Sequence, residues 1–391
     1  MNVYLDYSAT TPVKPEVLDA MMPYLKDFYG NPSSLHSYGR ENKKAMDTAR
    51  DQVAKTFNAK PEEIFFTGGG SESDNWAIKG AAAALKTKGR HIITSSIEHH
   101  AVLHTCQHLE KEGFEVTYLP VDDQGIISIE DLKDSLRPDT ILISIMYANN
   151  EIGTIQPVEE IAAIAKENKI LFHTDAVQVY GHFQIDTQTL PVDMISVSAH
   201  KLYGPKGVGA LYLRKGTKIH NLIHGGGQER KKRAGTENIA GIVGFGKAAE
   251  MAHENLDAHV KHLTELRDHL MQGILENIPN TRLNGHREKR LPNNVNVSFE
   301  FIEGESMLLS LDMVGIAASS GSACTSGSLD PSHVLLSLGL SHEMAHGSLR
   351  LTLGDQNTKE EIDYVLEQLP PIVQRLRDMS PLYETMKEGA R

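Results

Sequence analysis

A lysine at the end of an apolar run is the first residue in this sequence that could do covalent chemistry. Residues 193–209 have the sequence DMISVSAHKLYGPKGVG, so the apolar residues 194–197 lead directly to Ser198, His200 and Lys201. A lysine at the end of a buried strand is a candidate amine nucleophile, because burial lowers its pKa and frees its lone pair. For a lysine taken alone, a surface lysine at a strand end is the better interpretation, so the rest of the chain has to decide.

A glycine-rich segment offers a place for a phosphate group. Residues 68–73 have the sequence GGGSES, between an expected strand at 64–67 and an expected helix at 74–86. Free backbone N–H groups and the helix macrodipole favour a phosphate there. The spacing matches neither the dinucleotide-binding fingerprint nor a P-loop, so a plain turn remains open. Residues 241–247 nearly match a P-loop, but Ala248 replaces the Mg²⁺-binding hydroxyl residue, and we expect a helix.

Polar residues follow three other expected strands. Asp175 comes just after the strand expected at 170–173, where ligands bind in open α/β sheets. Its carboxylate could serve a cationic ring nitrogen or a metal, and a helix N-cap is the structural alternative. His99 ends a second strand and could stack on a planar ligand and exchange protons near neutral pH. Asn150 follows a third strand.

The two cysteines lie in different surroundings. Cys324 lies among small residues in 318–328, ASSGSACTSGS, for which we expect an exposed loop that leaves the thiol available. An incidental small residue in a linker is the alternative. Cys106 lies among apolar residues at helical spacing, and we expect it to pack in the core.

Two histidine patterns could indicate a metal. Residues 342–346, HEMAH, have zinc-protease spacing. The preceding Ser341, the following Gly347 and a strand expected at 349–353 leave only about one and a half helical turns, so we predict no metal site. The i, i+4, i+8 histidines of the helix expected at 100–112 are more simply surface residues.

Composition excludes several classes of protein. The 391 residues suffice for a large core and two domains. A formal net charge of −12 argues against a nucleic-acid or anionic-membrane binder. The first residues lack the pattern of a signal peptide, and no apolar run is long enough to span a bilayer. Because two cysteines fit a reducing compartment, we expect a cytoplasmic protein.

The elements that must position these residues alternate between strands and helices up to about residue 213. Such alternation is typical of a largely parallel sheet covered on both faces. A long helical pattern at 238–277 then links to a region with α+β character. We predict an α/β fold with a large domain at 15–255 and a small domain formed by 1–14 and 256–391.

One ligand would account for most of the candidate groups. Pyridoxal phosphate (PLP) needs an amine for its aldehyde, a carboxylate for its pyridinium nitrogen, a stacking ring and a phosphate cradle. These four requirements are met by Lys201, Asp175, His99 and the pair Gly70 and Ser71.

The motifs and their order strongly resemble the cysteine desulfurases of the NifS/IscS type, group I, among the fold-type I PLP enzymes of the class V aminotransferase family. The motifs are YLDYSATTP at 4–12, FTGGGSESDN at 66–75, EH at 98–99, NNEIG at 149–153, HTDAVQ at 173–178, SAHKLYGPKG at 198–207, RAGT at 233–236 and SGSAC at 320–324. The resemblance implies a mostly parallel seven-stranded sheet between helices, with a smaller α+β C-terminal domain.

The resemblance also implies three catalytic residues. Lys201 would form the Schiff base with PLP and move the Cα proton of the substrate. His99 would stack on the pyridine ring and shuttle protons. Cys324 would take the sulfur of L-cysteine as a persulfide and leave L-alanine.

The remaining implied residues bind cofactor or substrate. The PLP ring would be held by Asp175 and Gln178, and its phosphate by Gly70, Ser71, Ser198, His200 and, from the partner subunit, Thr236. That last contact requires a homodimer. The substrate carboxylate would be held by Asn150 and Arg350, the arginine being suited to a bidentate clamp.

The implied sulfur acceptor is an iron–sulfur scaffold or another thiolation partner. Two further classes of enzyme, PLP β-lyases and zinc proteases, and one non-enzyme remain as alternatives. A selenocysteine lyase or another PLP β-lyase would share the fold. A zinc protease would use the histidines of 342–346, and a non-catalytic sulfur carrier would have no need for the PLP-binding residues.

Overall fold

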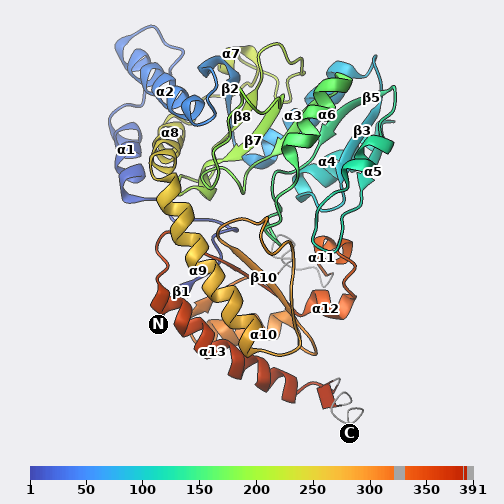
Figure 1. Cartoon of the computed structure of the whole chain (residues 1–391). Coiled ribbons are helices and arrows are strands. Elements are labelled where there is room, and N and C mark those ends of the chain that lie inside the picture. Colours follow the sequence, from blue (N-terminus) through green and yellow to red (C-terminus); the bar gives the residue numbers. More distant parts are fainter. Residues whose placement is uncertain (321–330, 382, 385–391) are drawn as a thin grey trace.

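A seven-stranded sheet forms the centre of the larger part of the molecule. This computed structural model describes residues 1–320, 331–381 and 383–384 (Figure 1). The strand order is β2-β8-β7-β6-β5-β3-β4, with β8 antiparallel to its two neighbours and the other pairs parallel. The strands are β2 (Ile64–Thr67), β3 (His91–Ser95), β4 (Glu115–Leu119), β5 (Thr140–Ser144), β6 (Leu171–Asp175), β7 (Met194–Ser198) and β8 (Gly209–Leu213). The predicted mostly parallel sheet is therefore confirmed.

Helices cover both faces of this sheet, because its strands are apolar on both sides. Along β2, Phe65 joins one apolar core and Phe66 the other, as strand alternation requires. The Phe65 core includes residues of α3 (Gly70–Leu85) and α4 (His100–Lys111). The Phe66 core includes residues of α1 (Pro15–Lys26), α2 (Ser37–Thr56), α5 (Ile129–Asp134), α6 (Val158–Asn168) and α8 (Ile239–Glu254). The short α7 (Gln228–Lys231) precedes α8.

A second, smaller layer is built on the antiparallel sheet β12-β10-β9. It comprises β9 (Thr281–Leu283), β10 (Asn294–Phe299), α10 (Gly304–Met313), α11 (His333–Ser337), α12 (His342–His346), β12 (Ser348–Thr352) and α13 (Lys359–Asp378). The N-terminal β1 (Val3–Tyr4) pairs with β11 (Ile316–Ala317), and Val3 and Leu5 belong to this layer's apolar core. We propose the division into 15–255 and 1–14 with 256–391 on this basis.

The long predicted helix at 238–277 is two helices. Asn255 ends α8 and precedes α9 (Leu256–Asn277), which runs from the large sheet to the smaller layer (Figure 1). Cys106 is buried in the Phe65 core, as predicted. Among helices in the described part of the chain, none is both long and apolar enough to cross a bilayer.

Candidate active site

A cavity of about 350 Å³ lies at the carboxyl ends of β6 and β7. The smaller layer closes it with Arg350 of β12, and the N-terminal segment closes it with Ser8 and Ala9. Of the predicted site residues that the structure describes, all but Thr236 line this cavity. They are Gly70, Ser71, His99, Asn150, Asp175, Gln178, Ser198, His200, Lys201 and Arg350.

Lys201 enters the cavity from a single 3₁₀ turn, Ala199–Lys201, directly after β7. Its Nζ donates hydrogen bonds to the backbone oxygens of Ser8 and Ala9, the latter at 2.8 Å. The N-terminal segment in turn holds this turn, because the Thr11 N–H donates to the His200 oxygen at 3.1 Å. An amine placed against carbonyl oxygens is oriented toward the cavity and can accept a covalent partner there.

Asp175 ends β6 and is buried at the floor of the cavity. Burial raises its pKa to about 6, while a hydrogen bond from the Val177 N–H (2.9 Å) and the charge of Lys201 oppose the rise. Such a carboxylate, kept from water, is suited to a cationic ring nitrogen.

Asp74 of α3 is a second buried carboxyl beside Asp175 that the sequence analysis missed. Asp74, His99 and Asp175 each place a ligand atom within 4.8 Å of the others, a set able to hold a cation. Oδ1 of Asp74 has no hydrogen-bond partner in the described chain and lies 3.6 Å from Nε2 of His173. Burial and then Asp175 raise the pKa of Asp74 well above its ordinary value. Its position could have indicated it as a cavity residue, because it lies four residues after Gly70 and therefore on the same face of the helix.

His99 is the N-cap of α4, and its Nδ1 accepts a hydrogen bond from the Ala101 N–H at 3.1 Å. Burial, followed by the charge of Lys201, lowers the pKa of His99 to about 4. The imidazole is therefore neutral near pH 7. Because Nδ1 accepts, the ring proton lies on Nε2, which makes His99 a donor on its remaining edge.

The glycine-rich turn and the end of β7 form an anion cradle. The helix α3 begins at Gly70, and the first backbone N–H groups of a helix have no partner within it. A Cβ atom on Gly70 would lie 2.7 Å from Cγ2 of Val177, so only glycine fits. Burial lowers the pKa of His200 to about 4, and its Nδ1 pairs with the Thr10 hydroxyl at 3.1 Å. Backbone and neutral groups, rather than cationic side chains, form this cradle.

Arg350 projects from β12 into the cavity and is only 1 % exposed. Its guanidinium donates to Oδ1 of Asp6 (3.0 Å) and to the backbone oxygen of Asn150 (3.3 Å). Its Nε has no hydrogen-bond partner in the described chain. A buried arginine with an unused donor is suited to a carboxylate ligand.

Two predicted residues lie elsewhere. Thr236 is exposed and does not line the cavity of its own chain. Cys324 lies outside the described residues. The helix of 342–346 is a five-residue turn, α12, and its two histidines are absent from the described cluster of potential metal ligands.

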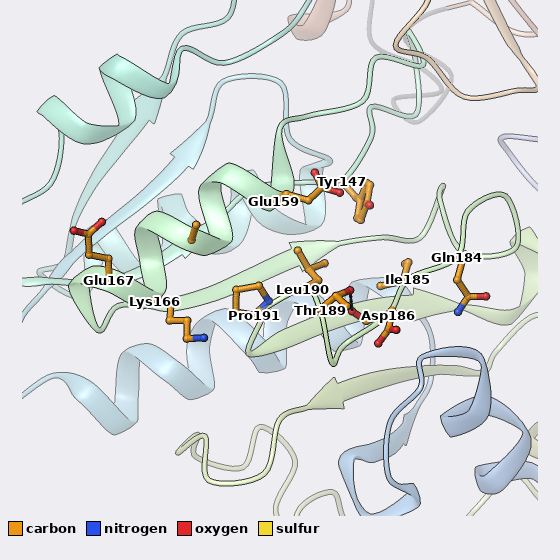
Figure 2. A pocket seen from close by; sticks show the side chains of 11 residues that line it. Tyr147, Glu159, Lys166, Glu167, Gln184, Ile185, Asp186, Thr189, Leu190 and Pro191 are labelled. Atoms are coloured by element: carbon orange, nitrogen blue, oxygen red, sulfur yellow. Dashed lines mark hydrogen bonds between the residues drawn. The ribbon is translucent and has the colours of Figure 1, made fainter.

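A larger hollow of about 730 Å³ lies between α6 and the segment 184–191 (Figure 2). Its charged side chains include Glu159, Lys166 and Glu167, all exposed, and none of the predicted site residues lines it.

Comparisons with known proteins agree on one family. The family model described as aminotransferase class-V matches residues 3–365. A protein named cysteine desulfurase IscS from Clostridium botulinum strain Hall is 62% identical over 385 residues, covering 98% of this chain and 97% of the relative. The protein of the same name from Methanosarcina thermophila is 61% identical, covering 97% and 94%.

Solved structures give the same result. A structure titled NIFS-LIKE PROTEIN matches with a TM-score of 0.91 and 43% identity, covering 96% of this chain and 100% of its own. A structure titled SspA in complex with cysteine has a TM-score of 0.81 and 40% identity, covering 91% and 100%.

Proposed function

The chain belongs to the class-V aminotransferase family of PLP-dependent enzymes and is a cysteine desulfurase, and on this premise we propose how its cavity binds PLP and L-cysteine. The carrying observation is that Lys201, Asp175, His99 and the start of α3 line one cavity although they come from separate elements. When bound, PLP supplies an electron sink for charge that develops at the substrate Cα.

The residues that line the cavity have the chemical groups that PLP requires, and some of their hydrogen-bond donors are not used within the described chain. The cradle at Gly70 would take the phosphate with the hydroxyls of Ser71 and Ser198. The Asp175 carboxylate would pair with the ring nitrogen, and Gln178 would reach the phenolic oxygen. The Nε2 of Gln178 donates one hydrogen bond to the Ser8 oxygen at 3.0 Å, which leaves its second N–H for the cofactor.

Two residues would handle protons. Lys201 would hold the aldehyde of PLP through its Nζ and, when the substrate amine displaces it, take the proton from Cα and return it. His99, neutral and with its proton on Nε2, would stack on the ring and shuttle protons. Because its pKa is about 4, it can supply a proton near pH 7 only after it has first taken one from a reacting group.

The substrate carboxylate would bind Arg350, with Asn150 beside it. Asp6 holds the guanidinium through one donor, so that the unpaired Nε edge is left for the ligand. Cys324, outside the described residues, would attack the substrate sulfur as a thiolate. The new S–S bond forms as the C–S bond breaks, the electron pair returns to carbon, and protonation there gives L-alanine and a persulfide on Cys324.

We propose a homodimer in which Thr236 completes the partner's phosphate site. Exposed apolar side chains are concentrated on α1 and the segment after it; Leu35 is 91 % exposed and Tyr29 77 % exposed. A surface of this kind usually marks an interface. The exposed Thr236 lies outside its own cavity, as a residue donated across the dimer would.

The sulfur would then pass from Cys324 to an acceptor protein, either an iron–sulfur scaffold or another thiolation partner. We place this transfer in the cytoplasm, where a reducing environment keeps a free thiol reactive.

Visible spectroscopy during turnover tests the proposal. Cys324→Ala should keep the absorbance of bound PLP and its change on adding L-cysteine, yet lose sulfide release. Wild-type sulfide release by Cys324→Ala would overturn its role as the sulfur acceptor. Parallel assays of alanine formation from L-cysteine and L-selenocysteine define the substrate preference.

A further inference from the structure

A polar cluster lies behind the turn that carries Lys201, where the smaller layer meets the large sheet. Its members are Lys14, His182, Tyr203, His259 and Asp355, around a cavity of only about 30 Å³ that Lys201 also lines. They come from the start of α1, from the segments after β6 and β7, from α9 and from the segment after β12. The cluster therefore joins the segments after β6 and β7 to the start of α1 and to the smaller layer.

Asp355 is the centre of this cluster. Its Oδ2 pairs with Nζ of Lys14 at 2.5 Å, and its Oδ1 pairs with Nδ1 of His259. Its backbone N–H donates to the phenol oxygen of Tyr203 at 2.7 Å. Burial raises the pKa of Asp355, but the hydrogen bonds from His259 and Lys14 outweigh burial and hold that pKa well below its usual range. The carboxylate is therefore charged and used on both oxygens.

Tyr203 connects Asp355 to the turn that carries Lys201. It lies two residues after Lys201 and has a φ of 64°, in the left-handed region that costs free energy for a residue with a side chain. Such a backbone persists only where its surroundings hold it. The Tyr203 N–H donates to the Thr11 hydroxyl at 2.9 Å, and the backbone N–H of Lys14 donates to the backbone oxygen of Tyr203 at 3.1 Å. Nζ of Lys14 lies 4.5 Å from the centre of the phenol ring.

The other side of Asp355 reaches the segment that follows Asp175. Nε2 of His259 pairs with Nδ1 of His182 at 3.0 Å, and the two rings stack at 5.0 Å between centres. Burial lowers the pKa of His182 to about 3, so this ring stays neutral and accepts or donates without opposing Lys14. Asp355 thus reaches the segment after β6 through its carboxylate and His259, and the segment after β7 through its backbone N–H on Tyr203.

We propose that Asp355 is a positioning residue that fixes the turn carrying Lys201 to the smaller layer. Its carboxylate holds Lys14, whose backbone N–H holds the backbone oxygen of Tyr203, and its own N–H donates to the Tyr203 hydroxyl. The inference rests on the proposed role of Lys201 as the PLP amine. Arg350, the proposed ligand of the substrate carboxylate, lies in β12, and Asp355 lies five residues later in the segment that follows this strand.

The chain contains a matched control. Asp363 also pairs with a histidine and a lysine, His269 at 2.6 Å and Lys359 at 3.8 Å. Its side chain is half exposed on α13, and exposed ion pairs contribute little. Asp363→Asn removes the same kinds of contact without touching Tyr203.

Hydrogen exchange of the full-length chain, measured with and without PLP, tests the proposal. In Asp355→Asn we expect amides of residues 199–204 to exchange at least about tenfold faster, because local opening of the turn becomes easier. PLP affinity and kcat should fall while the KM for L-cysteine changes less. Asp363→Asn should match the wild type in every measurement.

Tyr203→Phe removes only the phenol acceptor and serves if Asp355→Asn does not fold. It should change exchange in the same direction by a smaller factor. Unchanged exchange of 199–204 in a folded Asp355→Asn, or in Tyr203→Phe, overturns the proposal. Exchange is also measured without PLP, so the effect of Asp355 on the turn can be judged even if Lys201 proves not to bind PLP.

Discussion

Two hollows in the described part of the chain differ in size and in chemistry, and the smaller one is the proposed site. The hollow of about 730 Å³ lies against α6, and its charges, such as those of Lys166 and Glu167, are exposed (Figure 2). The cavity of about 350 Å³ has buried Asp74, Asp175 and Arg350 instead. Charges in water are screened, whereas charges buried away from water interact strongly with one another and with a charged ligand.

This difference teaches that a site depends more on functional side chains from several elements meeting at one place than on the volume of the hollow. Parallel strands end at one edge of a sheet, so the residues after β6 and β7 meet there with the start of α3. The larger hollow lies mainly between the flank of α6 and the segment 184–191, and its exposed charges come from α6.

Comparison of two lysines should give the largest effect. Lys201→Ala removes the amine that holds the PLP aldehyde and moves the Cα proton, so alanine formation should fall by at least about 10³-fold. Lys166→Ala in the larger hollow should leave the rate unchanged. Alanine assays and the visible spectrum of bound PLP check both. Wild-type rates in Lys201→Ala would reverse the assignment of the site.

Two aspartates give the next comparison. Asp175→Asn removes the negative charge opposite the ring nitrogen, and the rate should fall on the order of 10²-fold, with weaker PLP binding. Because burial raises the pKa of Asp175 to about 6, PLP binding to the wild type should also weaken below that pH. Asp186→Asn is the control, since Asp186 accepts hydrogen bonds from Asn58 and the Gln188 N–H at the larger hollow. Equal PLP affinities in the two variants would contradict the prediction.

Two glutamates give the smallest effect, on stability rather than rate. Burial raises the pKa of Glu98 to about 8, although hydrogen bonds from Ser95 and the Met146 N–H oppose the rise. The folded chain then binds more protons than the unfolded chain between about pH 4.5 and 8, so stability falls as pH rises, by on the order of a few kcal/mol. Glu98→Gln should flatten this slope in denaturant unfolding of the PLP-free protein.

Glu159→Gln, at an exposed acid of the larger hollow, should keep the wild-type slope. A slope that flattens equally in both variants would show that burial of Glu98 is not its cause.

Much of the site follows from the sequence because local signals mark the ends of strands. Apolar runs at 64–67 and 194–197 predicted strands that the structure confirms, and polar residues after such runs predicted Asp175 and Lys201 as cavity residues. The continuous helical pattern at 238–277 hid the break at Asn255, because both helices keep the same apolar spacing.

Other contacts had no local signal. Asp74 is one polar residue on a helix until folding buries it beside Asp175, and Asp355 is an ordinary surface residue type until α9 brings His259 to it. Asp6 and Arg350 are 344 positions apart in the chain yet form an ion pair at 3.0 Å.

By itself the sequence determined the fold class, the motifs that resemble those of PLP enzymes and the candidate lysine. These follow from residue type, spacing of apolar positions and strand-to-helix turns, all of which act over a few residues. Only the tertiary structure decided which carboxyls are buried, which hydrogen-bond donors remain unused and what holds the lysine turn. Those properties depend on desolvation and on contacts between distant segments, which exist only once the two layers have packed together.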